Sequence, residues 1–140
     1  MNNEFWRGIE QFNQQEFYAC HDTLEALWME AGESQKRFYQ GILQIAVACH
    51  HLSNLNWRGA VILLGEGIGR LRDYQPGHED IDVSGLIVQS VQLLKILQEG
   101  GAEQVADILQ QITNSEIDST VDIGITPIRG WPQIQRVVNG

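Results

Sequence analysis

Apolar residues recur at helical intervals along most of the chain, and this periodicity constrains the fold more than any other feature. Between Phe17 and Ala31, apolar side chains return every three or four residues, which is the spacing of one face of an α-helix. Other segments repeat this spacing, and no segment of useful length alternates polar and apolar residues as a strand does. The sequence therefore predicts an all-α protein, an up-and-down bundle of five to six helices with an irregular C-terminal tail.

Turn and capping residues set the limits of the predicted helices. Gly32 is expected to end the second helix and Ser34 to cap the third. The expected segments are Glu4–Phe12, Phe17–Ala31, 34–56, 57–74, a fifth carried by Leu86, Ser90, Leu93 and Leu97 that ends at Gly100-Gly101, and a sixth carried by Val105, Ile108, Leu109 and Ile112. Short connections between them favour antiparallel neighbours.

The third predicted helix has apolar residues on more than one side. One face carries Phe38, Ile42, Ile45, Cys49 and Leu52, and further apolar residues stand on its other sides in place of charges. A helix that is apolar around most of its circumference is buried by neighbours on several sides. We therefore expect it to be the central helix of the bundle.

The composition changes near residue 114. Residues 1–113 are predicted to form one helical domain, and 114–140 carry prolines, glycines and β-branched residues that make a long helix improbable. Apolar residues are nevertheless frequent in this tail: Ile125, Ile128, Trp131 and Ile134. The composition alone would suit a mobile tail, but we expect the tail to dock on the bundle or on a second subunit, because these side chains would be unfavourable in water.

Charge and cysteine content limit the possible partners. The formal net charge is −9, which disfavours nucleic acid and anionic membranes as partners. Cys20 and Cys49 have neither the spacing of a CxxC motif nor the density of a disulfide framework, so reduced core thiols are expected. The first residues lack a signal-peptide pattern and no apolar run is long enough for a membrane span, which predicts a cytoplasmic protein.

One polar motif stands among the apolar residues of the second helix. His21 and Glu25 are four residues apart, and therefore neighbours on one side of a helix, at the edge of the apolar stripe. On the third helix, Gln40, Gln44 and His51 share a second stripe. We expect these five side chains to face one another across a seam between the two helices.

This seam allows three interpretations. His21, Glu25 and His51 could bind a divalent metal ion, although they are fewer than the ligands of a di-iron bundle and no Glu-x-x-His motif occurs. A histidine oriented by a glutamate could instead act in acid-base catalysis, with no nucleophile to define the reaction. The third interpretation is a satisfied polar network that fixes helix register.

The glycines of "LGEGIGR" do not favour a nucleotide site. Gly65, Gly67 and Gly69 do not have the GxGxxG spacing, and no strand precedes them. Close helix packing or a local kink is the expected role.

The segments "GIEQFNQQEFYACHDTLEALWMEAG", "RFYQGILQIAVACHHL" and "NWRGAVILL" together resemble the bacterial and archaeal domain-of-unknown-function family 309, over about residues 5–74. The resemblance implies a small, self-associating helical bundle with no assigned activity. It places the polar signature of the family on Glu10, Asn13, His21, Glu25, Trp28, Gln40, Gln44, His51, Asn56 and Gly59. Gly65, Gly67, Gly69 and the tail lie outside it.

Two functional hypotheses follow. The first is a non-enzymatic interaction or structural module, expected to be a homodimer, in which the seam is only a polar network. The second is a small-ligand or metal-binding pocket, or an acid-base catalytic one, with His21 as base or ligand and Glu25 as its partner. Its lining would be Gln40, Gln44 and His51, supported by Glu10, Asn13, Trp28 and Asn56. The candidate cofactor is a divalent metal.

Overall fold

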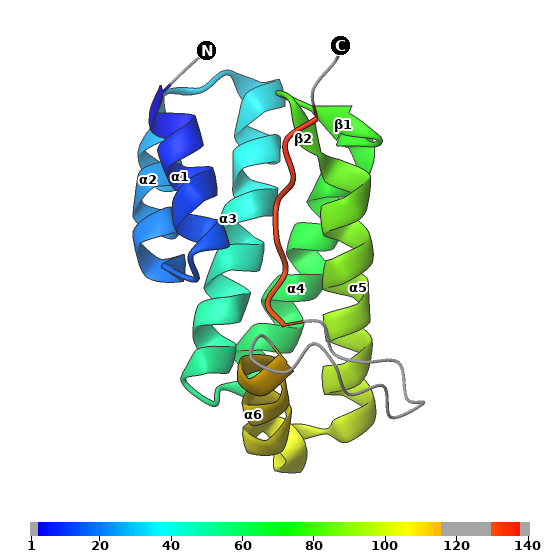
Figure 1. Cartoon of the computed structure of the whole chain (residues 1–140). Coiled ribbons are helices and arrows are strands. Elements are labelled where there is room, and N and C mark those ends of the chain that lie inside the picture. Colours follow the sequence, from blue (N-terminus) through cyan, green and yellow to red (C-terminus); the bar gives the residue numbers. More distant parts are fainter. Residues whose placement is uncertain (1–2, 116–129, 138–140) are drawn as a thin grey trace.

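The computed structural model describes residues 3–115 and 130–137, which form a helical bundle crossed by one extended segment (Figure 1). The helices are α1 (Asn3–Asn13), α2 (Phe17–Glu30), α3 (Glu33–Ser53), α4 (Trp57–Leu71), α5 (Val83–Gly100) and α6 (Val105–Ser115). Short 3-10 turns, η1 (Arg72–Tyr74) and η2 (Ala102–Gln104), extend α4 and precede α6. The predicted all-α bundle is confirmed.

Helix α3 lies at the centre of the bundle. It packs against α2 on one side and α4 on the other, while α1 packs on α2 and α5 on α4 (Figure 1). The predicted stripe is fully buried, with no exposed surface on Phe38, Ile42, Ile45, Cys49 or Leu52. Burying one such side chain contributes about 1.5–3 kcal/mol, so this helix carries a large share of the folding free energy. The expectation of a central third helix is correct.

Helices α3 and α4 approach closely because two glycines face one another. A Cβ on Gly67 would lie 2.7 Å from Ile45 Cγ1 and 2.8 Å from the Gly41 carbonyl oxygen, and a Cβ on Gly41 would lie 2.8 Å from Leu71 Cδ2. Contacts this short would force the two helices apart. The expectation of close helix packing is therefore confirmed for Gly67. Around Gly65 and Gly69 a Cβ would meet nothing within 4 Å, so these two glycines have no such role in the described chain.

The helix starts follow the capping rules at α4 and α5 but not at α3. Asn56 accepts a hydrogen bond from the Gly59 N–H at 3.0 Å, and Asp82 accepts one from the Gly85 N–H at 2.9 Å. Ser34 was predicted to cap α3, and this is wrong, because the helix begins at Glu33 after an extended Gly32. Gly32 therefore takes the N-cap position, two residues before Ser34.

A small β-hairpin, absent from the sequence prediction, joins η1 to α5. Strands β1 (Gly77–His78) and β2 (Ile81–Asp82) pair antiparallel, with His78 opposite Ile81. The two turn residues between them, Glu79 and Asp80, have φ of 51° and 61°. This left-handed backbone is usual for two-residue hairpin turns but is normally occupied by asparagine or glycine, so the residue types gave no signal.

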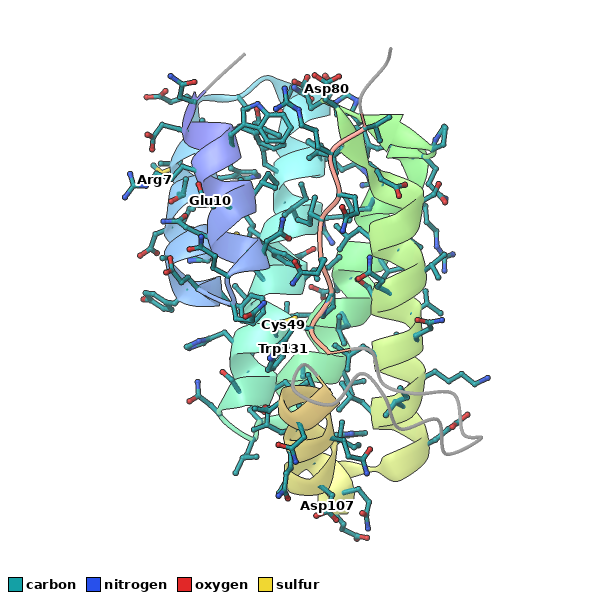
Figure 2. All side chains as sticks on the ribbon, in the orientation of Figure 1. Arg7, Glu10, Cys49, Asp80, Asp107 and Trp131 are labelled. Atoms are coloured by element: carbon teal, nitrogen blue, oxygen red, sulfur yellow. The ribbon has the colours of Figure 1, made fainter. Side chains whose placement is uncertain are left out.

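Residues 130–137, here called the strap, run in extended form across the bundle from Trp131 to the hairpin (Figures 1 and 2). Trp131 is buried, with its ring 5.2 Å from that of Phe17, and Ile134 is 3% exposed. At its far end the strap adds to β2 through Asp82 N–H to Gln135 O (2.9 Å) and Val137 N–H to Asp80 O (2.8 Å). Trp131 and Ile134 thus dock on the bundle, whereas Ile125 and Ile128 lie outside the described residues.

Two side-chain amides fix the strap by its backbone. Asn13 of α1 donates to the carbonyl oxygen of Ile134 (2.9 Å) and accepts from its N–H (2.7 Å). Gln89 of α5 makes the same pair of bonds to Gln133, at 2.9 and 2.8 Å. An amide side chain that pairs in this way imitates a neighbouring strand, so the strap gains sheet-like hydrogen bonds where helices surround it.

The predicted domain boundary at residue 113 stays a prediction, since α6 extends to Ser115 and 116–129 are not described.

Within the described residues, no helix has the length and apolarity needed to cross a membrane.

The α3–α4 crossing gives a first prediction. We expect Gly67→Ala to lower the free energy of unfolding by about 1–3 kcal/mol, because the added methyl group overpacks against Ile45 and the Gly41 backbone. Urea denaturation followed by circular dichroism measures this change. An unaltered midpoint would show that the helices do not cross as closely as described.

Candidate functional site

His21 and Glu25 of α2 lie together, as the spacing predicted, and Asp22 completes the group. His21 Nε2 lies 3.3 Å from Glu25 Oε2, and His21 Nδ1 lies 3.2 Å from Asp22 Oδ1. The imidazole thus lies between two carboxylates, one at each ring nitrogen. The side chains are 26% and 48% exposed for His21 and Glu25, which places the group at the surface and not inside a seam.

Trp28 lies one turn beyond Glu25 and contacts Lys36 of α3. The Nζ of Lys36 is 5.0 Å from the centroid of the indole ring, within the range of a cation-π interaction. The indole Nε1 is buried and has no hydrogen-bond partner among the described residues. Trp28 therefore packs between α2 and α3, and it does not contact His21 by any hydrogen bond.

The histidine of α3 that lies beside α2 is His50, and not the predicted His51. The exposed Tyr18 ring of α2 stands between two imidazoles, 6.0 Å from His21 and 5.4 Å from His50. His50 Nε2 also lies 3.2 Å from the Asn54 amide nitrogen. Sequence reasoning chose His51 because it shares a stripe with Gln44. Which of the two histidines faces α2 depends on which side of α3 packs against α2, and the sequence alone does not show this.

The predicted glutamine stripe turns toward α4, away from His21. Gln44 is buried, and its Nε2 donates to Glu66 Oε2 of α4 at 3.0 Å. Its Oε1 is buried with no hydrogen-bond partner among the described residues. Gln40 is half-buried four residues earlier, on the same side of α3 by helical phase, and makes no side-chain hydrogen bond to the described residues.

His51 belongs to the start of α4. Its Nδ1 lies 3.2 Å from Asn56 Nδ2, and the Asn56 side-chain oxygen caps α4 at Gly59. A Cβ on Gly59 would lie 2.8 Å from the His51 ring and 2.8 Å from Asn56 Nδ2. The three residues form one capping unit, in which the glycine leaves room for the imidazole. The structure therefore does not bring His51 to His21 and Glu25.

The two remaining supporting residues belong to α1 and have separate roles. Asn13 holds the strap, as described above, and its own backbone oxygen accepts from Gln133 Nε2 at 3.2 Å. Glu10 is exposed and accepts from Gln14 Nε2 at 3.2 Å (Figure 2). Neither of them contacts the His21 group.

A second histidine cluster, which the sequence did not indicate, lies at the hairpin. His78 Nε2 donates to Gln35 Oε1 at 2.6 Å, and Gln35 Nε2 donates to Glu79 Oε1 at 2.7 Å. The imidazole packs 4.5 Å from the Phe38 ring and 4.9 Å from the Tyr74 ring. These contacts attach the hairpin to the first turns of α3. Only a sequence reading that placed residues 77–82 beside α3 could have found the cluster.

An open pocket of about 540 Å³ lies on the hairpin and is lined by residues 76–82 with Val137. None of the residues predicted for the polar seam lines it. Asp82 within it is already engaged as the cap of α5. The pocket therefore does not coincide with the site predicted from the sequence.

The two cysteines are buried and free, as expected for core thiols. Burial raises the pKa of the Cys20 thiol to about 12. Burial also raises the pKa of Cys49, and the proximity of Cys20 adds to the effect. Both thiols remain protonated near neutral pH and do not act as nucleophiles there.

The part-buried Asn13–Ile134 hydrogen bonds and the exposed His21 ion pairs give a second prediction. We expect Asn13→Ala to lower the free energy of unfolding by about 1–3 kcal/mol, because it leaves the N–H and C=O of Ile134 unpaired. His21→Ala should cost under about 1 kcal/mol, because its ion pairs are at the surface. Urea denaturation compares the two, and hydrogen exchange at the Ile134 amide should quicken only in Asn13→Ala. A larger loss for His21→Ala would mean that the His21 group is a structural network.

The comparisons with known proteins agree with the resemblance. The model of the family described as Domain of unknown function (DUF309) matches residues 5–63. The "Uncharacterized protein YpuF" of Bacillus subtilis (strain 168) is 31% identical over 91 residues, which are 64% of this chain and 49% of that protein. The chain thus spans about half the length of this relative. No solved structure matches the chain.

The matched segment contains α1 from Phe5 onward, all of α2 and α3, and the first part of α4. It therefore includes the His21 group, Gln44 and the His51–Asn56–Gly59 cap, whereas Glu66 lies outside it. The resemblance predicted from the sequence is confirmed over these residues: the segment 5–63 is a match to the domain-of-unknown-function family 309.

Proposed function

We propose that the chain is a non-enzymatic helical interaction module that works as a homodimer in the cytoplasm. Support comes first from how the polar residues are used. Those predicted to share one seam take part in separate local contacts: His21 with Asp22 and Glu25, Gln44 with Glu66, and His51 with Asn56. Each contact has a local role on one helix or one helix pair.

The observation that carries the proposal is the set of large apolar side chains on two neighbouring outer helices. Ile62 of α4 is 47% exposed, and Val88 and Val91 of α5 are 56% and 41% exposed. The two helices pack side by side, and the Trp57 indole at the start of α4 donates to the Leu97 carbonyl oxygen near the end of α5 at 2.7 Å. Exposed apolar side chains on two adjacent helices favour a protein–protein contact.

This proposal gives a third prediction. Light scattering on the purified chain should give twice the chain mass of 15.8 kDa at micromolar concentration, with a return toward one chain mass on dilution. A mass of one chain at every accessible concentration would contradict the homodimer.

A divalent metal site is the second candidate, and the geometry of the His21 group favours it. His21, Asp22 and Glu25 each offer a ligand atom, and these atoms lie within 4.8 Å of one another. One imidazole nitrogen and two carboxylate oxygens suit Zn²⁺ with water as a fourth ligand. The group differs from the predicted set in that Asp22 stands where His51 was expected.

The metal candidate gives a fourth prediction. If the group binds Zn²⁺, a concentration one hundredfold above the dissociation constant should stabilise the fold by about 2.7 kcal/mol, seen as a rise in the melting temperature. The rise should disappear in His21→Ala and persist in His50→Ala, which removes the other imidazole beside Tyr18. The same rise in His21→Ala, or none in the parent chain, would rule out this metal site.

A further inference from the structure

The outer side of α2 carries one continuous stripe of exposed side chains. Tyr18, Asp22, Glu25 and Met29 follow one another at intervals of four, three and four residues. At 100° per residue they fall within about 60° around the helix axis, and we call them the α2 stripe. Tyr18 and Met29 are 61% and 68% exposed, more than any other large apolar side chain of the described residues. The stripe therefore has carboxylates at its centre and exposed apolar side chains at both ends.

The two carboxylates form an incomplete set of metal ligands with His21. The three ligand atoms lie within 4.8 Å of one another, whereas tetrahedral Zn²⁺ takes four ligands. The side chains of His21, Asp22 and Glu25 are 26%, 61% and 48% exposed, so the set lies at the surface of the bundle. An ion held there has its fourth position open to whatever covers the α2 stripe.

The charge of α2 opposes contact with a second copy unless a cation is present. The helix contains no lysine or arginine. Lys36 of α3 contacts α2 through the Trp28 ring, which lies about 90° around the axis from the middle of the stripe. Two such stripes repel each other because their charges are alike. Two Zn²⁺ ions would balance the four carboxylates that Asp22 and Glu25 contribute from two copies.

The order of residues in the α2 stripe suits an antiparallel contact with itself. Tyr18 and Met29 have the same midpoint along the chain as Asp22 and Glu25. In an isologous contact about a two-fold axis at this midpoint, positions equally far from the axis face each other. Tyr18 then faces Met29 of the second copy, and sulfur–aromatic contacts of this kind are favourable. Asp22 likewise faces Glu25 of the second copy, which brings a carboxylate to the open position of the ion.

We infer that Zn²⁺ joins two copies of this chain through the α2 stripe. Each ion is bound by His21, Asp22 and Glu25 of one copy and by a carboxylate oxygen of the second copy, which replaces water as the fourth ligand. Tyr18 and Met29 close the two ends of the contact. This inference rests on the metal site, the second candidate under the proposed function, and it does not depend on the apolar surface of α4 and α5.

Sedimentation equilibrium of the full chain in Zn²⁺ and in EDTA tests the metal dependence. The mean mass in zinc should be at least twice the mass in EDTA, with one ion bound per chain. His21→Ala should abolish the increase, and its fold is retained because the side chain lies at the surface. The matched control is His50→Ala, which removes the second imidazole beside Tyr18 and should keep the increase.

The apolar ends of the contact are tested by a variant that keeps every ligand. Met29→Ala removes the contact with Tyr18 of the second copy, and this contact occurs twice in each pair. The dissociation constant of the zinc-linked pair should therefore rise at least tenfold. Leu55→Ala shortens a side chain that is 51% exposed at the turn between α3 and α4, and it should leave the constant unchanged.

The antiparallel register is tested by isotope-filtered nuclear Overhauser spectra in zinc. In pairs of one ¹³C-labelled and one unlabelled copy, the Tyr18 ring protons should show a cross-peak to the Met29 methyl protons of the second copy. Within one chain these residues are eleven positions apart, roughly 16 Å along the helix at 1.5 Å per residue, which is too far for a cross-peak. The Phe12 and Phe17 rings lie 5.5 Å apart inside one chain and should give no intermolecular cross-peak.

The outcomes separate this inference from the proposed function. A chain that gains no thermal stability from Zn²⁺ would overturn both the metal site and the α2 contact. A chain that binds Zn²⁺ without an increase in mass, or that pairs in zinc without the Tyr18–Met29 cross-peak, would overturn the α2 contact and leave the metal site in place. Pairing in zinc with that cross-peak, lost in His21→Ala, supports the inference. The mass in EDTA tests the homodimer separately.

Discussion

The close contact between Gly67 of α4 and Gly41 of α3 determines how the rest of the bundle is arranged. Because neither residue has a side chain, the backbone of α4 can lie on α3 near Ile45, and the free sides of α4 are then fixed. One of these sides meets α5, and Glu66 of α4 contacts Gln44 of α3. The exposure of Gly65, Gly69 and Ile62 follows from the same contact, since residues two apart on a helix cannot point the same way. Within one short motif, Gly67 is thus needed for helix packing, whereas Gly65 and Gly69 are exposed.

The strap shows a different way to complete a small helical core. Trp131 and Ile134 supply apolar surface, but an extended chain between helices also buries its own N–H and C=O groups. Asn13 and Gln89 meet this need with paired amide contacts, and β2 continues them to the end of the strap. Asn13 lies in the segment that matches the family model, whereas Gln89 and the strap lie outside it. The clamp therefore combines a residue of the matched segment with residues beyond it.

The helices could be predicted from the sequence because each is set by local periodicity, although the cap at Asn56 was not predicted. The hairpin could not, because Glu79 and Asp80 adopt a left-handed turn that their residue types do not signal. The His21–Glu25 pair was also accessible, since its spacing lies on one helix. Contacts between residues on different helices could not be predicted. Whether Gln44 and His51 face α2 depends on which side of α3 packs against α4. The sequence alone does not distinguish the packed Gly67 from the exposed Gly65 and Gly69. For the same reason, the sequence predicts His51 beside α2, whereas His50 lies there in the structure.

The arrangement of the bundle depends on α4 lying directly on α3 at Gly67, and a nuclear Overhauser experiment tests this contact most directly. In the folded, ¹³C-labelled chain, the Gly67 α-protons should show a strong cross-peak to the side-chain protons of Ile45, because a Cβ on Gly67 would lie 2.7 Å from Ile45 Cγ1. A folded chain that lacks this cross-peak, or that shows it from the Gly65 α-protons instead, would contradict the account.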